Sequence, residues 1–314
     1  MNNISVILPL YNDAAIAESA ISTIISLLEQ HLPLWELVIV DDASTDQTLA
    51  VIKAQRNAER ANVRIFSMAR NRGQHAAFVV GCQMAKGPWY LTFDADYAAA
   101  IASLPSLVET AASHDSDLVS VSRAGQRKIP GYRRLGSIVL NALVNRATKK
   151  AMQDPLSPIK LVHQSIVHQC QHFGEKRRFL APLAISLARN PIETSIPLPQ
   201  KRGRTHFDIY DLARLTLDFM LNFFPRIFPR LLVWSLLGIV LSSLAGAGYL
   251  IMRIMGFIEA NVIFQVLDFA FLFMCLNALS LAIIGEYHLR AYTLISESSP
   301  YEATEIKISP EVIS

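Results

Sequence analysis

Charged residues are scarce in this chain. Asp, Glu, Lys and Arg make up only 18% of its 314 residues, whereas hydrophobic residues make up 52%. Ordinary soluble domains carry about 25% charged residues, so this composition predicts long apolar segments. The formal net charge of +3 is too small for a protein whose whole surface binds nucleic acid, and we expect no nucleic-acid partner.

Cysteine is also rare, since Cys82, Cys170 and Cys275 are the only three and none forms a CxxC pair. This spacing excludes a disulfide framework and gives no zinc-site signature. We expect the three as small buried side chains in a reducing compartment. The first residues lack a basic stretch followed by a long apolar run and a cleavage site, so we expect no secretory signal and a cytosolic N-terminal part.

Two segments near the C-terminus hold the apolar excess. Residues 231–252 contain no charge, and a helix of that length, rising about 1.5 Å per residue, crosses a hydrocarbon core. Residues 262–285 contain one charge, Asp268. We predict a transmembrane hairpin over residues 231–287. Asp268 either lies at the far interface, which we favour, or pairs within the hairpin.

A hairpin places the segments before and after it on one side of the membrane. Arg226, Arg230 and Arg290 flank it on that side, against Arg253 and Glu259 in the link. The positive-inside rule therefore predicts that this side is cytoplasmic. The alternative is a buried hairpin in a soluble core, which needs two uncharged helices longer than most globular helices.

Short apolar runs alternate with helical patterns in the first part of the chain. We predict strands over 4–10, 35–40, 63–66, 89–93 and 117–121, and helices over 13–31 and 74–85. This alternation predicts an α/β fold with a parallel sheet covered on both faces, whose ligands bind at the carboxyl ends of the strands. Acidic residues stand at those ends: Asp13, Asp41, Asp42, Asp94 and Asp96.

The carboxylate pair in Asp94-Ala95-Asp96 can hold a hard divalent cation, which in turn binds a diphosphate. Alone this is a weak signal, because the same residues also serve as turns or helix caps. Residues 41–46 strengthen it, since a carboxylate there can accept a hydrogen bond from a nucleobase or a ribose hydroxyl. Capping of the next helix by Ser44 or Asp46 is compatible with that role.

Four segments between residues 8 and 97 resemble, in order, the motifs of family 2 inverting glycosyltransferases with a GT-A fold. They are LPLYND (8–13), VDDASTDQT (40–48), RNRGQHAA (70–77) and FDADY (93–97). IGEY (284–287) and the tail segment Ser299-Pro300-Tyr301 are similar to the polyisoprenyl-phosphate glycosyltransferases. That group includes dolichyl-phosphate mannose synthase and bacterial enzymes that load glucose or aminoarabinose onto undecaprenyl phosphate.

The resemblance implies a cytosolic GT-A (Rossmann-like) catalytic domain over residues 1–207 and a cytosolic tail over residues 288–314. Between the catalytic domain and the hairpin, apolar and charged residues are interspersed over 208–230, which indicates amphipathic helices along the membrane. Small residues at 244–248 permit close helix packing, within the hairpin or in a homo-oligomer.

The resemblance also assigns the donor site. It places donor contacts at Pro9, Tyr11, Asp13, Asp42, Asn71, Gly73 and Asp94. It implies Mg²⁺ or Mn²⁺ on Asp94 and Asp96, and Asp96 is the residue expected to contact the metal directly and to be catalytic. Ala98 stands at the position of a possible third ligand, so the source of that ligand stays open.

Residues 123–150 contain eight basic residues and no acidic one, which indicates a phosphate ligand. For Lys149 and Lys150, contact with anionic lipid head groups is an equal alternative. The resemblance places acceptor-phosphate contacts at Arg123, Arg133, Arg134, Arg202 and Arg204. Arginine suits this role because its planar fork makes bidentate bonds to phosphate.

The resemblance gives Arg123 and Asp154 catalytic roles, in which Asp154 orients or polarises the acceptor phosphate. The alternative for Asp154 is a turn residue before proline. Ser157-Pro158-Ile159-Lys160 stands where relatives have Gly-Phe-Arg, so the acceptor loop is expected to be remodelled.

Together these features imply an inverting transferase. It would move a sugar from a nucleotide diphosphate sugar, UDP-linked by analogy, to undecaprenyl phosphate at the cytoplasmic face of a bacterial inner membrane, as a multi-pass protein. The sugar and the base stay open. The alternative is a non-catalytic membrane binding or scaffold protein with the same fold, which Ala98 and the altered 157–160 loop motivate. A processive synthase is disfavoured, because no tryptophan follows an arginine.

Overall fold

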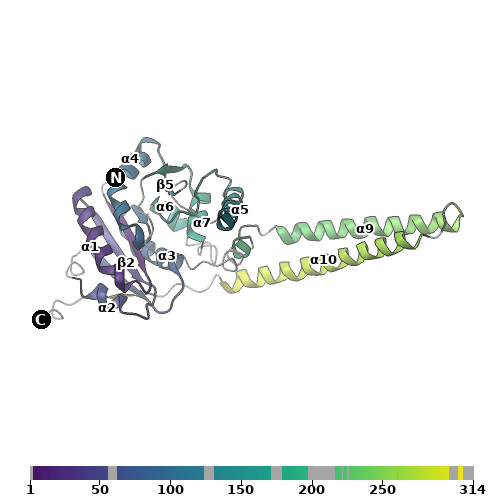
Figure 1. The fold of residues 1–314 in the computed structure, drawn as a ribbon, viewed down its shortest axis with the longest axis horizontal. Coiled ribbons are helices and arrows are strands. Elements are labelled where there is room, and N and C mark those ends of the chain that lie inside the picture. Colours follow the sequence, from purple (N-terminus) through teal and green to yellow (C-terminus); the bar gives the residue numbers. More distant parts are fainter. Residues whose placement is uncertain are drawn as a thin grey trace. The chain divides into compact units, whose positions relative to one another are not determined.

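The structure, a computed structural model, describes residues 3–55, 62–123, 131–170, 179–196, 216–220, 222–224, 226–259, 261–296 and 303–306, with backbone alone for 131–135 and 292–296. The chain divides into two compact units. The first comprises residues 1–219 and 299–314, and the second comprises residues 220–298 (Figure 1). The C-terminal segment therefore belongs to the same unit as the N-terminal one.

An eight-stranded mixed sheet forms the centre of the first unit, in the order β7-β5-β6-β4-β1-β2-β3-β8. Its strands are β1 Ile4–Leu10, β2 Trp35–Asp41, β3 Val63–Met68, β4 Trp89–Thr92, β5 Leu118–Ser122, β6 Lys160–His163, β7 Pro191–Ser195 and β8 Ala303–Ile306. All five strands predicted from the sequence are present. Strands β4, β1, β2 and β3 run parallel, as expected.

The sheet is mixed because two strands that the sequence analysis did not predict run in the opposite direction. Strand β6 runs antiparallel to both β4 and β5, and β8 runs antiparallel to β3. Strands β6, β7 and β8 are also the ones that the sequence analysis missed. Each is short and lacks a long apolar run, so the pairing depends on distant partners rather than on a local pattern.

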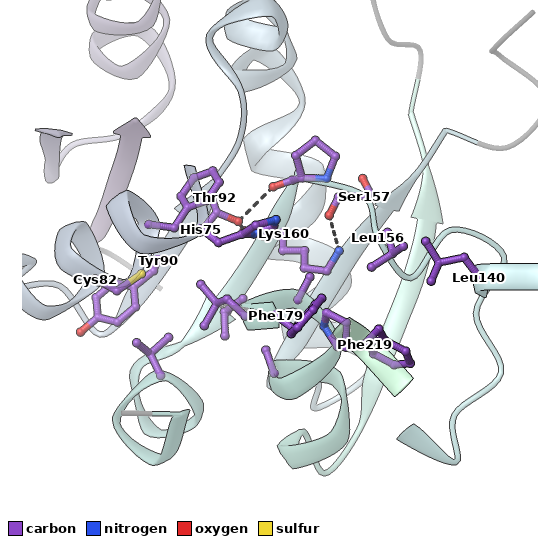
Figure 2. A pocket seen from close by; sticks show the side chains of 18 residues that line it. His75, Cys82, Tyr90, Thr92, Leu140, Leu156, Ser157, Lys160, Phe179 and Phe219 are labelled. Atoms are coloured by element: carbon purple, nitrogen blue, oxygen red, sulfur yellow. Dashed lines mark hydrogen bonds between the residues drawn. The ribbon is translucent and has the colours of Figure 1, made fainter. Parts of the chain in front are cut away.

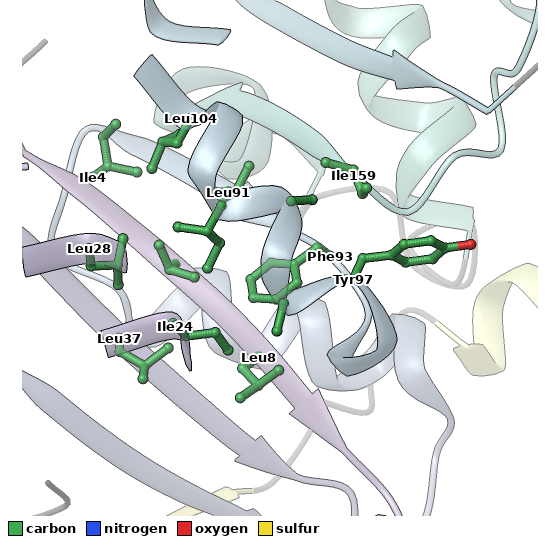
Figure 3. Packing of buried hydrophobic residues seen from close by; sticks show 14 of the residues in the cluster. Ile4, Leu8, Ile24, Leu28, Leu37, Leu91, Phe93, Tyr97, Leu104 and Ile159 are labelled. Atoms are coloured by element: carbon green, nitrogen blue, oxygen red, sulfur yellow. The ribbon is translucent and has the colours of Figure 1, made fainter. Parts of the chain in front are cut away.

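Helices cover both faces of this sheet. The first unit contains α1 Ala14–His31, α2 Thr48–Lys53, α3 Gln74–Met84, the 3₁₀ segment η2 Ala95–Ser103, α4 Leu104–Ser113, α5 Gly131–Thr148, α6 Gln164–Cys170 and α7 Leu180–Leu187. The predicted helices over 13–31 and 74–85 correspond to α1 and α3. Figure 3 shows Ile24 and Leu28 of α1 packed over Leu8, Leu37 and Leu91 of three neighbouring strands.

Strand β1 is buried along its whole length because both of its faces are covered. Its alternate residues, such as Leu8, face α1, whereas Ile7 faces α3. Gly81 of α3 lies so close to Ile7 that an added Cβ would collide with that side chain, and a Cβ there would also lie 3.3 Å from Val40. Glycine therefore sets the close approach of α3 to the centre of the sheet.

The second unit contains α9 Ile227–Ile254 and α10 Val262–Ser296, which pack against each other. Both are long and apolar enough to cross a membrane, and they contain the predicted spans 231–252 and 262–285. The predicted end of the second span at Gly285 is not the end of the helix. Gly285 packs under the ring of Phe228, and Glu286 pairs with Arg290 one turn later at 2.9 Å, so α10 continues.

Asp268 pairs within the hairpin, the placement that we did not favour. Ser242 Oγ donates to Asp268 Oδ1 at 2.7 Å, and a Cβ added to Gly246 would lie 2.9 Å from Asp268 Oδ2. Ser242 of α9 thus supplies a hydrogen bond to the Asp268 carboxyl group, and the absence of a side chain at Gly246 leaves room for it. The three cysteines are buried and unpaired, as the sequence predicts.

Gly238 of α9 faces Cys275 of α10, and this contact yields a test of the hairpin register. A Cβ added to Gly238 would lie 3.6 Å from Cys275 Cβ, within the range of natural disulfides. The variant Gly238→Cys is therefore expected to form an intrachain disulfide under mild oxidation. After trypsin cleavage at the intervening Arg253, the two fragments should stay linked until reductant is added.

The matched control is Gly248→Cys on the same helix, because a Cβ there meets nothing within 4 Å. Equal cross-linking of both variants, or cross-links only between chains, would contradict this packing of α9 on α10.

Candidate active site

A pocket of about 150 Å³ opens at the carboxyl ends of the parallel strands. It is lined by Pro9, Leu10, Tyr11, Asp13, Ile16, Asp42, Gln74, Asp94, Ala95 and Asp96. The pocket thus brings together six of the residues that the sequence analysis assigned to donor or metal binding, from the ends of β1, β2 and β4. Parallel strands deliver their polar ends to one edge, so this convergence follows from the sheet.

The loops after β1 and β2 are fastened to each other. Asn12, whose φ of +53° lies in the left-handed region that asparagine tolerates, accepts the N–H of Thr45 on its side chain at 2.9 Å. Its own N–H donates to Ser44 Oγ at 3.1 Å, and the N–H of Asp13 donates to Thr48 Oγ1 at 2.8 Å. These bonds hold Tyr11 and Asp13 at the rim of the pocket.

Asp46 connects these loops to the first residues of two helices by hydrogen bonds. Its carboxylate accepts the N–H of Thr48, the first residue of α2, at 2.9 Å and the N–H of Ala14, the first residue of α1, at 3.3 Å. Ser44 was the other residue predicted to cap the helix. Its hydroxyl instead accepts the N–H of Asn12.

Asp42 is buried and braces the neighbouring loop. Its two carboxylate oxygens accept the N–H groups of Arg72 and Gly73 at 2.9 and 2.7 Å. Burial raises the pKa of Asp42, the two N–H groups lower it, and the charge of Asp41 raises it further. Gly73 has a φ of +87°, so glycine is required where this loop enters α3. The carboxylate thereby fixes the start of α3 at the edge of the pocket.

Asp94 and Asp96 follow β4 at the mouth of the pocket. Gln74, the first residue of α3, donates its side-chain amide to Asp94 Oδ1. Among the described residues no group of three or more acidic, histidine or cysteine side chains forms a metal site. Two carboxylates still fit a divalent cation whose other ligands are substrate phosphates, which is how Mg²⁺ is usually bound. Ala98 is buried in the core and supplies no ligand.

Arg123 and Asp154 form a mostly buried ion pair beside this pocket. Arg123 Nε donates to Asp154 Oδ2 at 2.7 Å and Nη2 to Oδ1 at 3.0 Å, and the Arg123 N–H donates to Oδ2 at 3.1 Å. Burial alone would raise the pKa of Asp154, but the hydrogen bonds and charge of Arg123 lower it. Tyr97, next to Asp96, also stabilises the charge of Arg123, so the pair adjoins the Asp94–Asp96 segment.

Two residues that sequence reasoning gave no role complete this cluster. Glu193 of β7 accepts the N–H groups of Gln153 and Asp154 at 2.6 and 2.7 Å, which fixes the loop that carries the ion pair. Lys160 of β6 is buried and donates to the carbonyl of Ser157. Burial lowers the pKa of Lys160 to about 7, although the charge of Asp154 opposes the shift.

The sequence marks the residues to which it assigned no role, Gln74, Lys160 and Glu193, to different degrees. Gln74 stands inside the RNRGQHAA segment, and Lys160 inside the segment that departs from the family, so both were marked by the sequence. Glu193 lies on β7, whose sequence Pro-Ile-Glu-Thr-Ser lacks an apolar run, and no local pattern marks it.

Several predicted phosphate contacts stay predictions. Arg133 and Arg134 lie on α5, where the structure describes their backbone alone, and Arg202 and Arg204 lie outside the described residues. Asn71 is exposed and does not line the pocket. Ten of the 23 residues of the predicted amphipathic segment 208–230 also lie outside the described residues, and among the described ones 216–220, 222–223 and 227–230 are helical.

A family model described as Glycosyl transferase family 2 matches residues 5–170, more than half of the chain and the part that holds the pocket and the Arg123–Asp154 pair. The chain belongs to this family. This family 2 glycosyltransferase is 27% identical over 304 residues to the undecaprenyl-phosphate 4-deoxy-4-formamido-L-arabinose transferase of Sodalis glossinidius, with 93% of this chain and 90% of that protein covered. The protein of that name from Pseudomonas aeruginosa is 29% identical over 295 residues, with 92% and 86% covered.

Solved structures resemble its fold. Glucosyl-3-phosphoglycerate synthase from Mycobacterium tuberculosis, in complex with Mn²⁺, uridine diphosphate and glucosyl-3-phosphoglycerate, gives a TM-score of 0.52 at 18% identity and covers 71% of this chain and 80% of its own. Mannosyl-3-phosphoglycerate synthase from Rubrobacter xylanophilus gives 0.51 at 17% identity, with 72% and 74% covered. At these identities the likeness establishes the GT-A fold alone.

The buried ion pair of this family 2 enzyme predicts a large cost for Asp154→Asn. Removing one partner leaves the buried Arg123 charge uncompensated, which costs about 3–5 kcal/mol. In a unit of this size the melting temperature should fall by on the order of 10 °C. Because the pKa of Asp154 is lowered, its stabilisation is full above its ordinary pKa of 3.8 and disappears as the pH falls through the folded value.

The matched control is Asp115→Asn, which breaks the pair between Asp115 and Arg189, whose side chains are 91% and 74% exposed. Such exposed pairs contribute about 0–1 kcal/mol. Thermal unfolding of the full chain in detergent at neutral pH measures both variants. Equal melting temperatures for the two would show that the Arg123–Asp154 pair is not buried as described.

Proposed function

We propose that this chain transfers one sugar, with inversion, from a nucleotide diphosphate sugar to undecaprenyl phosphate at the cytoplasmic face of a bacterial membrane. The observation that carries the proposal is the pocket at the strand ends, where Asp94 and Asp96 lie beside the buried Arg123–Asp154 pair. The same chain carries two helices long enough to cross a membrane, where a lipid acceptor resides. Relatives that match over nine tenths of the chain are named as undecaprenyl-phosphate sugar transferases.

For donor binding, the proposal relies on the loops after β1 and β2, which are hydrogen-bonded to each other. Tyr11 is 43% exposed at the rim and offers an aromatic face to the base, while Asp13 and Asp42 present carboxylates toward the ribose. A divalent cation, bound when the donor is present, would offset the charge of the departing diphosphate. Asp94 and Asp96 would hold it, and the amide of Gln74 fixes the orientation of Asp94.

The acceptor side needs positioning rather than a strong base. A phosphate monoester is already largely ionised at neutral pH, since its second pKa is about 6. Asp154 is engaged with Arg123, so its contribution is to hold that guanidinium in a fixed orientation at the edge of the site. An arginine fixed in this way can align the phosphate oxygen with the anomeric carbon of the donor.

The reaction class is tested by transfer from a panel of radiolabelled UDP- and GDP-sugars to undecaprenyl phosphate in detergent, with and without EDTA. We expect a labelled lipid with one UDP-sugar and its loss on chelation. The non-catalytic alternative predicts nucleotide binding without a labelled lipid from any donor. A labelled lipid that resists EDTA would refute the cation while leaving the transfer intact.

The cation ligand is tested by Asp96→Ala, which should lower transfer at least about 100-fold, because a lost metal contact removes several kcal/mol of transition-state stabilisation. The control is Glu109→Ala, an exposed acidic residue of α4 outside the pocket, which should keep near-normal transfer. Both proteins should show the same melting temperature. Near-normal transfer by the Asp96 variant would remove the metal assignment.

A further inference from the structure

A second cavity, of about 210 Å³, lies in the same unit on the α3 side of the sheet. Strands β4 and β6 form its floor, and helices α3, α6 and α7 form its walls (Figure 2). Its lining is largely apolar and aromatic, with Phe78, Tyr90, Phe179 and Phe219 among the larger side chains. A cavity of about 150 Å³ with such a lining takes up benzene, so this volume accommodates several carbon atoms of a branched chain.

Lys160 contributes an amine to this apolar cavity. Its side chain is 3% exposed, and Figure 2 shows it extending along the cavity to the carbonyl of Ser157. An ammonium group offers three hydrogen-bond donors, and within the described part of the chain Ser157 is the one acceptor in contact with it. A buried cation with so few partners is costly unless an anion accompanies it.

A second buried polar group stands next to Lys160. Ser120 of β5 is directly opposite Lys160 of β6 in the antiparallel register, so the two side chains share one face of the sheet. Ser120 is fully buried, and its hydroxyl has no hydrogen-bond partner among the described residues. Ser120 does not itself line the cavity. The under-satisfied amine of Lys160 does, and a phosphate oxygen is an acceptor for it.

The two carboxylates near Lys160 accept hydrogen bonds from other groups. Asp154 is held by Arg123, and Glu193 accepts two backbone N–H groups of the same loop. Their charges influence Lys160, but neither contacts its amine. No carboxylate of the described residues therefore contacts the amine, and burial lowers its pKa to about 7.

The cavity and the donor pocket are lined by residues that are close in sequence. His75 lines the cavity and follows Gln74 of the donor pocket, and Thr92 lines the cavity two residues before Asp94 of the donor pocket. An occupant of the cavity thus lies near the groups that would hold the donor diphosphate.

We propose that this cavity receives the phosphate end and the first isoprenoid carbons of the acceptor, with the Lys160 amine as a phosphate contact. The inference rests on the proposed function for the identity of the acceptor. An apolar chain with an anionic end matches the cavity, because the Lys160 amine is set in a largely apolar wall, with the unpartnered Ser120 hydroxyl beside it on the same face of the sheet.

The test is binding of farnesyl phosphate, farnesol and inorganic phosphate to the purified full chain in neutral detergent, measured by calorimetry without any sugar donor. We expect farnesyl phosphate to bind more tightly than either of the other two. Lys160→Met should weaken farnesyl phosphate at least tenfold and leave farnesol unchanged, since a charge-assisted bond to phosphate is lost. Lys160→Arg should retain part of the affinity.

The matched control is Lys53→Met, which removes an exposed lysine at the end of α2 that lines neither the cavity nor the donor pocket. It should bind farnesyl phosphate as the unchanged chain does. UDP binding reports on the donor pocket and should be equal in all variants. If Lys160→Met weakens farnesol and farnesyl phosphate equally, or weakens UDP as well, Lys160 only shapes the site and the proposal is overturned.

The outcomes separate the two proposals. Sugar transfer to undecaprenyl phosphate together with unchanged farnesyl phosphate binding in Lys160→Met would overturn the cavity assignment alone. Lys160-dependent binding of farnesyl phosphate without transfer from any donor would overturn the catalytic proposal alone. Inorganic phosphate binding as tightly as farnesyl phosphate would assign the amine to a free anion and also overturn the isoprenoid site.

Discussion

The parallel pairing of β1 with β2 and β4 is the constraint on which the site depends. These strands are buried on both faces, between α1 on one side and α3 on the other, so their polar residues lie near the strand ends. Ser5 and Glu36 lie near the starts, and Asp41 and Thr92 lie where the strands end. Because the strands run in one direction, those ends meet at one edge of the sheet. The hydrophobic packing that fixes the register therefore also fixes the distance between Asp42 and the Asp94–Asp96 segment.

Buried charge is the other feature that shapes the unit. Arg123, Asp154, Lys160 and Glu193 are gathered around one loop, and replacing such charges by apolar side chains often leaves a protein equally or more stable. Their presence is thus better explained by what they bind than by what they stabilise. Arg123 and Asp154 satisfy each other, whereas Lys160 faces a cavity, and this difference agrees with the positioning role proposed for the pair and the ligand contact proposed for Lys160.

The parts of the structure that the sequence predicts are those with local signals. Long apolar runs mark β1, β2, α9 and α10, and motif residues at strand ends mark the pocket that they line. Strands β6, β7 and β8 were missed because their order comes from partners far along the chain, as when β8 pairs with β3 and Glu305 meets Arg64 at 3.0 Å. Asp268 was misplaced for the same reason, since Ser242 and Gly246 receive it only when two helices are packed.

The start of α3 connects the two pockets. Its first residue, Gln74, contacts Asp94 in the donor pocket, and the next, His75, lines the cavity behind it. Both residues follow Gly73, whose N–H is held by the buried carboxylate of Asp42. A shift of this short segment would therefore move the walls of both pockets together. Under the proposed function, one buried carboxylate would thus help to set the relative position of donor and acceptor, on which in-line transfer depends.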